Sequence, residues 1–210
     1  ISALLFYNKL KTDLEGYGFE VNPYDPFVAN KIVNGNQLTV TWHVDDLKIS
    51  HIEAKTVSEF IFWVKATYGA IGEVKTSRGK LHDYLGMKLD YTVPVQLSVN
   101  MVEYIKKMVK NFPQDQLIGA KPKAPWTANL FTVNEESPKL AKKQSELFHT
   151  VVAQGLFLCK RGRPDIAPAI AFLTTRVKGP DVEDWSKLVK LIQFLKHTSK
   201  DVLTIRMDGK

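Results

Sequence analysis

Apolar and polar residues alternate along residues 28–50, a period that is typical of β-strands. Asn34-Gly35 interrupts the first part of this pattern, and this dipeptide is the strongest short signal for a β-hairpin. Asp45 and Asp46 interrupt the second part, and no other residue is left for a turn between the flanking strands. The pattern therefore predicts a three-stranded antiparallel meander with both aspartates at the tip of its second hairpin.

Helical and strand patterns also surround this meander. Apolar residues recur at helical spacing over residues 3–17 and 57–68, whereas residues 85–91 and 96–99 alternate as strands do. A further amphipathic helix is expected to start at Asn100. This order of elements favours an α+β fold with an antiparallel sheet and packed helices.

The second half of the chain reads as mainly helical. Residues 113–146 are polar and basic, and they hold four prolines that break any long element: Pro113, Pro122, Pro125 and Pro138. We expect this stretch to be a linker with short local structure. Three helical segments follow, marked near their starts by Leu147, Asp165 and Asp181, and the end of the chain resembles a strand.

Composition narrows the functional classes. The 210 residues carry 29 Lys and Arg against 22 Asp and Glu, so the net charge of +7 makes a polyanion a plausible partner. Cys159 is the single cysteine, which excludes a disulfide framework and is typical of an intracellular protein. No apolar run reaches the length needed to span a membrane, so we expect no membrane partner.

The aspartate pair is the main chemical candidate. Neighbouring residues of a strand point to opposite faces, so two adjacent carboxylates converge only where the backbone turns. Such a pair suits a hard divalent cation like Mg²⁺, and paired ions about 4 Å apart drive in-line phosphoryl transfer. A solvated turn is the alternative reading of an Asp-Asp dipeptide.

The residues around the pair resemble a known family. The stretch "HVDDLKIS" is similar to the x-V-D-D hairpin of copia-type retrotransposon reverse transcriptases. Other segments resemble further parts of the same enzymes. The palm helix and the strand after it resemble "LLFYNKLKTDLEGYGFEVNPYDPFVANK", and the primer-grip segment resembles "RGKLHDYLGMKLDY". The first thumb helix resembles "MVEYIKKMVKNF", and the connection to ribonuclease H resembles "GLFLCKRGRPDIAPAIAFLTTRV" and "DWSKLVKLIQFLKHT". The resemblance extends over nearly the whole chain.

The resemblance implies an RNA-directed DNA polymerase. Asp45 and Asp46 would be catalytic and would bind two Mg²⁺ ions, for which Mn²⁺ could substitute. Leu85 and Gly86 would belong to the primer grip. An RNA template and an RNA–DNA hybrid would be the partners, contacted along the thumb helix by Lys106, Lys107 and Lys110.

The resemblance also implies an organisation. Residues 1–99 would form a partial palm with the x-V-D-D hairpin, residues 100–146 a thumb helix and a basic linker, and residues 147–210 a connection region. The fingers and first catalytic aspartate would lie upstream, and ribonuclease H downstream, so we expect this chain alone to be inactive. His43 stands where the family more often has Tyr.

Two alternatives remain beside a polymerase. The chain could be a non-catalytic nucleic-acid-binding module, or an inert remnant of a transposable element. For the polymerase, either a cytoplasmic virus-like particle or the nucleus is the expected location.

Overall fold

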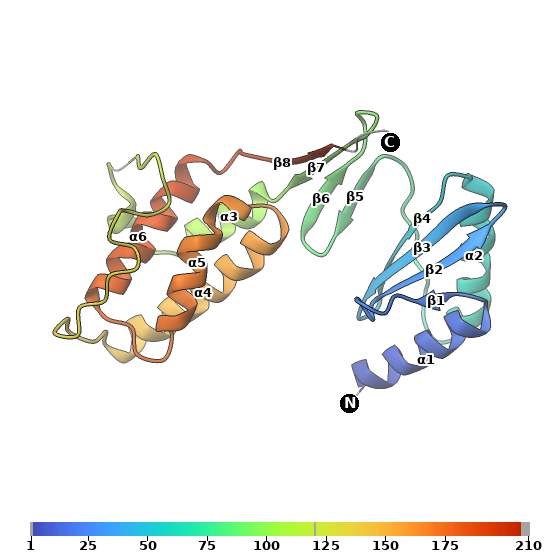
Figure 1. Ribbon diagram of the computed structural model, residues 1–210, viewed down its shortest axis with the longest axis horizontal. Helices are drawn as coiled ribbons and strands as arrows, with labels where there is room; N and C mark the ends of the chain where they lie inside the picture. Colours follow the sequence, from blue (N-terminus) through green and yellow to red (C-terminus); the bar gives the residue numbers. More distant parts are fainter. Residues whose placement is uncertain (1, 120, 207–210) are drawn as a thin grey trace. The chain divides into compact units, whose positions relative to one another are not determined.

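The computed structural model describes residues 2–119 and 121–206. These residues form a mixed α/β structure with two antiparallel sheets and six α-helices (Figure 1). The chain divides into two compact units, Ile1–Arg78 and Gly79–Lys210. Residue 99, after which a boundary was expected, lies in the second unit within the strand Gln96–Asn100, and this strand pairs with Leu203–Arg206 near the end of the chain.

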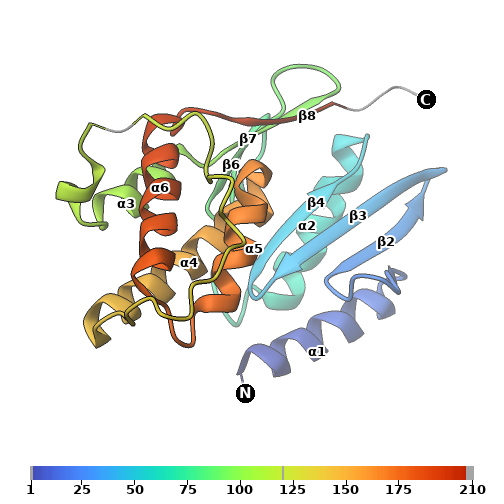
Figure 2. The ribbon, with the colours of Figure 1, turned by 60° about the vertical axis from the view of Figure 1, so that its left-hand side comes forward.

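The first unit is a four-stranded sheet with two helices. Its elements are α1 (Ser2–Gly16), β1 (Glu20–Val21), β2 (Val28–Val33), β3 (Asn36–His43), β4 (Asp46–Ser50) and α2 (Ala54–Tyr68). The strands pair antiparallel in chain order, so the predicted meander is confirmed over β2, β3 and β4 (Figure 2). Asn34 and Gly35 form the first hairpin turn with φ values of 51° and 76°, which confirms that prediction as well.

The period-two pattern of β3 separates the two faces of this sheet. Leu38, Val40 and Trp42 are buried, and they share one hydrophobic cluster with residues of both helices, including Leu10, Leu14, Phe60 and Val64. The opposite face is polar. There the Thr39 hydroxyl donates to the Asn30 amide oxygen (2.9 Å), and the Gln37 amide donates to the Thr39 hydroxyl (2.9 Å).

The second unit combines a small sheet with a helical core. Its elements are β5 (Leu81–Tyr84), β6 (Met87–Asp90), β7 (Gln96–Asn100), α3 (Val102–Lys110), a 3₁₀ turn (Gln114–Leu117), α4 (Lys142–Arg161), a second 3₁₀ turn (Pro164–Ile166), α5 (Ala167–Arg176), α6 (Val182–His197) and β8 (Leu203–Arg206). The strands pair in the order β5-β6-β7-β8, so the two ends of this unit meet in one sheet. None of the helices in the described ranges is both long and apolar enough to cross a membrane.

The proline-rich stretch differs from the expected linker. Residues 113–119 and 121–141, which we call the strap, make repeated hydrogen bonds to α6 and its N-terminal flank, and α4 already begins at Lys142. The bonds run from Trp185 Nε1 to Gln116 Oε1 (2.7 Å), from Gln193 Nε2 to Gln116 O (2.8 Å), from Lys187 Nζ to Thr132 O (2.6 Å) and from the Val182 amide to Pro138 O (3.0 Å). Donors of α6 thus form hydrogen bonds with carbonyl groups of the strap. The polar composition of the strap alone would predict that these carbonyls bind water instead.

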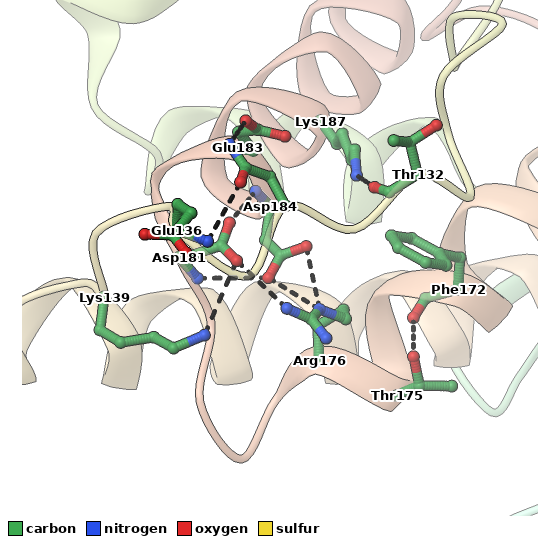
Figure 3. Close-up of polar contacts among 11 residues, drawn as sticks. Thr132, Glu136, Lys139, Phe172, Thr175, Arg176, Asp181, Glu183, Asp184 and Lys187 are labelled. Atoms are coloured by element: carbon green, nitrogen blue, oxygen red, sulfur yellow. Dashed lines mark hydrogen bonds and ion pairs between the residues drawn. The ribbon is translucent and has the colours of Figure 1, made fainter.

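A buried ionic cluster joins α5 to the start of α6 (Figure 3). Arg176 Nε donates to Asp184 Oδ2 (2.9 Å), and its Nη2 donates to Asp181 Oδ2 (3.1 Å). Asp181 and Asp184 also form a capping box, which confirms Asp181 as the start signal of this helix. Burial alone would raise the pKa of Asp181, but hydrogen bonds from the Asp184 amide and from Arg176 outweigh it, and this pKa lies below its ordinary value.

Asp165, the other expected start signal, does not cap α5. It lies in the 3₁₀ turn before that helix and accepts two hydrogen bonds from Arg163, at 2.9 and 2.8 Å. Arg163 is 3% exposed and also donates to the carbonyl and hydroxyl of Thr198 at the end of α6. Its guanidinium therefore ties the α4–α5 junction to the C-terminus of α6.

Candidate metal-binding hairpin and nucleic-acid surface

The second hairpin of the first sheet carries the aspartate pair, with a turn that differs from the expected one. His43 pairs with Asp46, so the two-residue turn consists of Val44 and Asp45, and Asp46 is the first residue of β4. Val44, but not Asp45, has a positive φ (55°), which is the pattern of a type II′ turn. Glycine is the usual residue at this position, and a β-branched residue there is strained.

The register of this hairpin orients the pair. Trp42 lies opposite Leu47 and is buried in the core, so the next pair outward, His43 and Asp46, lies on the other, polar face of the sheet. Trp42 thus anchors the register, because a slip of one residue would expose it.

Asp45 and Asp46 are both exposed, and within the described part of the chain neither carboxylate accepts a hydrogen bond or forms an ion pair. Two adjacent carboxylates offer hard oxygen ligands to a divalent cation. Among residues 2–119 and 121–206, no third His, Cys, Asp or Glu joins them in a metal-binding group. The donor chemistry therefore fits Mg²⁺ at a two-carboxylate site that further ligands would have to complete.

The Leu85–Gly86 turn lies in the second unit. It joins β5 to β6 through the pair Tyr84 and Met87, and both turn residues have positive φ, 50° and 74°. This is the geometry of a type I′ hairpin, for which glycine is a favoured residue.

Helix α3 presents the predicted lysines on its exposed face. Lys106, Lys107 and Lys110 are exposed, whereas Ile105 and Met108 on the opposite side are buried. Lys106 Nζ forms an ion pair with Glu103 Oε1 at 2.8 Å, and this bond lowers the pKa of Glu103 below its ordinary value. Lys107 and Lys110 have no ion pair within the described residues, so they are the better candidates for phosphate contacts.

A cluster beside the β5–β6 turn was not predicted. The rings of Tyr104 and Phe157 stack with centroids 5.1 Å apart, and the Arg161 guanidinium carbon lies 3.8 Å from the centroid of Phe157. A β-carbon at Gly86 would lie 3.9 Å from two ring carbons of Phe157. The spacing of Phe157 and Arg161, four residues apart on α4, is the one signal in the sequence that could have suggested their contact.

Comparison with protein-family models finds no match for this chain, and neither do comparisons with curated proteins and with solved structures. The resemblance of the hairpin, the turn and the lysine-bearing helix to reverse transcriptases therefore rests on the residues themselves.

Proposed function

We propose that this chain is the palm, thumb and connection part of a copia-type reverse transcriptase, an RNA-directed DNA polymerase. The observation that supports it most strongly is the hairpin tip, where two adjacent exposed carboxylates follow a strained Val44. Residues held in unfavourable backbone conformations cluster at active sites, where the surrounding fold maintains them. Val95 has nearly the same φ (53°) in a turn without adjacent carboxylates, so the strain at Val44 supports the proposal only together with Asp45 and Asp46.

In this proposal Asp45 and Asp46 would hold Mg²⁺ through their carboxylate oxygens. The bound metal would supply Lewis-acid activation of the attacking hydroxyl and neutralise charge on the reacting phosphate. The hairpin would contribute by holding Asp46 at the start of β4 and Asp45 in the two-residue turn directly before it. Because no third carboxylate joins the pair among the described residues, we expect the 210-residue chain alone not to extend a primed RNA template.

The second unit would bind the template–primer duplex. Lys107 and Lys110 offer cations for phosphate oxygens, and the Leu85–Gly86 turn offers a tight backbone edge for the primer strand. The resemblance adds the fingers and ribonuclease H segments of the polyprotein as partners of the complete enzyme.

Paramagnetic line broadening by Mn²⁺ tests the metal site. We expect Mn²⁺ to broaden the amide resonances of the β3–β4 hairpin first, and Asp45→Asn or Asp46→Asn to abolish this effect. Glu135→Gln is the matched control, because Glu135 and Glu136 form another exposed adjacent pair in the strap. Broadening that survives both aspartate substitutions would refute the metal site.

A second candidate function is nucleic-acid binding without catalysis, which the unpaired Lys107 and Lys110 favour. It predicts salt-dependent binding to an RNA–DNA hybrid together with no selective Mn²⁺ broadening at the hairpin. The two measurements together separate this function from the polymerase.

A further inference from the structure

Two arginines flank Gly162 at the end of α4, and the structure uses them differently. Arg163 is buried, and its guanidinium donates hydrogen bonds to Asp165 and Thr198. Arg161 is half-buried and has no carboxylate or carbonyl partner among the described residues. Its guanidinium donors are therefore available to a ligand.

The aromatic stack holds Arg161 in place. Its guanidinium carbon lies 3.8 Å from the Phe157 ring centroid, close enough for a strong cation–π contact. Tyr104 stacks on the same ring at an interplanar angle of 24°, and its hydroxyl donates to Gln154 O (3.4 Å). A planar guanidinium fixed in this way loses little side-chain entropy when it binds an anion.

The position of the stack points to one kind of ligand. A β-carbon at Gly86 would be in van der Waals contact with the ring of Phe157, so Arg161, which rests on that ring, lies near the β5–β6 turn. The described residues place no carboxylate within ion-pair distance of Arg161, and its neighbour Lys160 is an exposed cation. A free, planar guanidinium suits phosphate, because two of its N–H groups match two phosphate oxygens.

We propose that Arg161, oriented by Phe157 and Tyr104, binds a backbone phosphate of the nucleic-acid strand that passes over the Leu85–Gly86 turn. This inference rests on the proposed function for the presence of a duplex, and it adds a specific phosphate contact on α4 to the surface of the thumb region. Phe157 acts as a positioning residue in this contact.

Duplex binding as a function of salt tests the contact. The probe is a fluorescein-labelled RNA–DNA hybrid, titrated with the full chain and followed by fluorescence anisotropy. Arg161→Gln should weaken binding roughly tenfold and reduce the slope of log affinity against log salt by about one. Lys160→Gln removes the same charge from the adjacent exposed position, and it should weaken binding clearly less. The thermal unfolding temperature of each variant verifies that it is folded.

Two further variants separate charge from geometry. Arg161→Lys keeps the cation but loses the planar fork, so it should keep most of the salt slope while binding more weakly than the natural chain. Phe157→Leu should weaken binding in the natural background and change it little in the Arg161→Gln background, because the stack acts through Arg161.

The outcomes distinguish this inference from the proposed function. If the natural chain binds the hybrid and Arg161→Gln behaves like Lys160→Gln, the phosphate contact is wrong and the proposed function stands. Additive effects of Phe157→Leu and Arg161→Gln would also overturn the positioning role. If the natural chain shows no salt-dependent binding to the hybrid, both proposals fail.

Discussion

Replacing Arg176 with Met should destabilise the second unit strongly. The substitution leaves Asp181 and Asp184 buried, at 1% and 2% exposure, without their guanidinium partner. Removing one member of a buried ion pair costs about 3–5 kcal/mol, since the remaining charge is uncompensated. The side chain of Arg176 is 19% exposed, so water can approach the cluster and the lower figure of about 3 kcal/mol applies. For a unit of this size, that corresponds to a fall of about 10 °C in unfolding temperature.

Differential scanning calorimetry of the full chain measures this effect. Lys139→Gln is the control, because Lys139 lies 3.8 Å from the same Asp181 but is 58% exposed, and its loss should cost less than about 0.5 kcal/mol. A second substitution gives a sharper test. Asp184→Asn should destabilise the natural chain, yet it should stabilise the Arg176→Met variant, because there it removes an unpaired buried charge.

This reversal of sign is the decisive result. If Asp184→Asn destabilises both backgrounds equally, the cluster acts through packing and capping alone, and the electrostatic reasoning is refuted. The same conclusion follows if Arg176→Met and Lys139→Gln have similar unfolding temperatures.

Three further predictions concern the hairpin, the helical core and the sheet edge. Val44→Gly should relieve about 1–2 kcal/mol of strain from the left-handed backbone conformation. Because glycine also makes the unfolded chain more flexible, which costs about 0.5–1 kcal/mol, the stability should be nearly unchanged or slightly higher. Val44→Gly should also weaken Mn²⁺ binding. The control is Val95→Gly, since Val95 has nearly the same φ (53°), and this variant should leave Mn²⁺ binding intact. Equal Mn²⁺ titrations of the two variants would contradict this prediction. The new methyl group of Gly155→Ala would overlap Ile170 Cδ1, so calorimetry should show a loss of about 1–3 kcal/mol of stability. Adding Ile170→Val should restore part of this stability, and additive effects of the two substitutions would disprove the overlap. Strand β4 is one of the two outer strands of the first sheet in the described structure, so we expect light scattering to show that the chain self-associates at high concentration. A stable monomer would show that this edge is protected.

Local sequence patterns were sufficient for the elements whose partners are close in the chain. Alternation placed β2, β3 and β4, Asn34-Gly35 specified their first turn, and Asp181 marked the start of α6. These predictions succeeded because backbone conformation and side-chain period are set within a few residues. Most of the predicted site residues are exposed, and Leu85 is half-buried. Their function remains a proposal.

Other features depended on contacts that no local pattern contains. The strap is ordered by donors from α6 that lie some fifty to eighty residues further along the chain, and β8 pairs with β7 across the whole second unit. The turn at Val44 also escaped prediction. Trp42 is buried and lies opposite the half-buried Leu47, and this pair sets the register and overrides the local preference for aspartate in the turn.

Arg161 and Arg163 show the difference most clearly. The sequence by itself determined that two cations flank a glycine at the end of a helix. The tertiary structure alone decided that Arg163 is enclosed by Asp165 and Thr198, whereas Arg161 rests on Phe157 and donates to no other group among the described residues. The physical reason is that the role of a charged side chain depends on which groups surround it, and those groups come from distant parts of the chain.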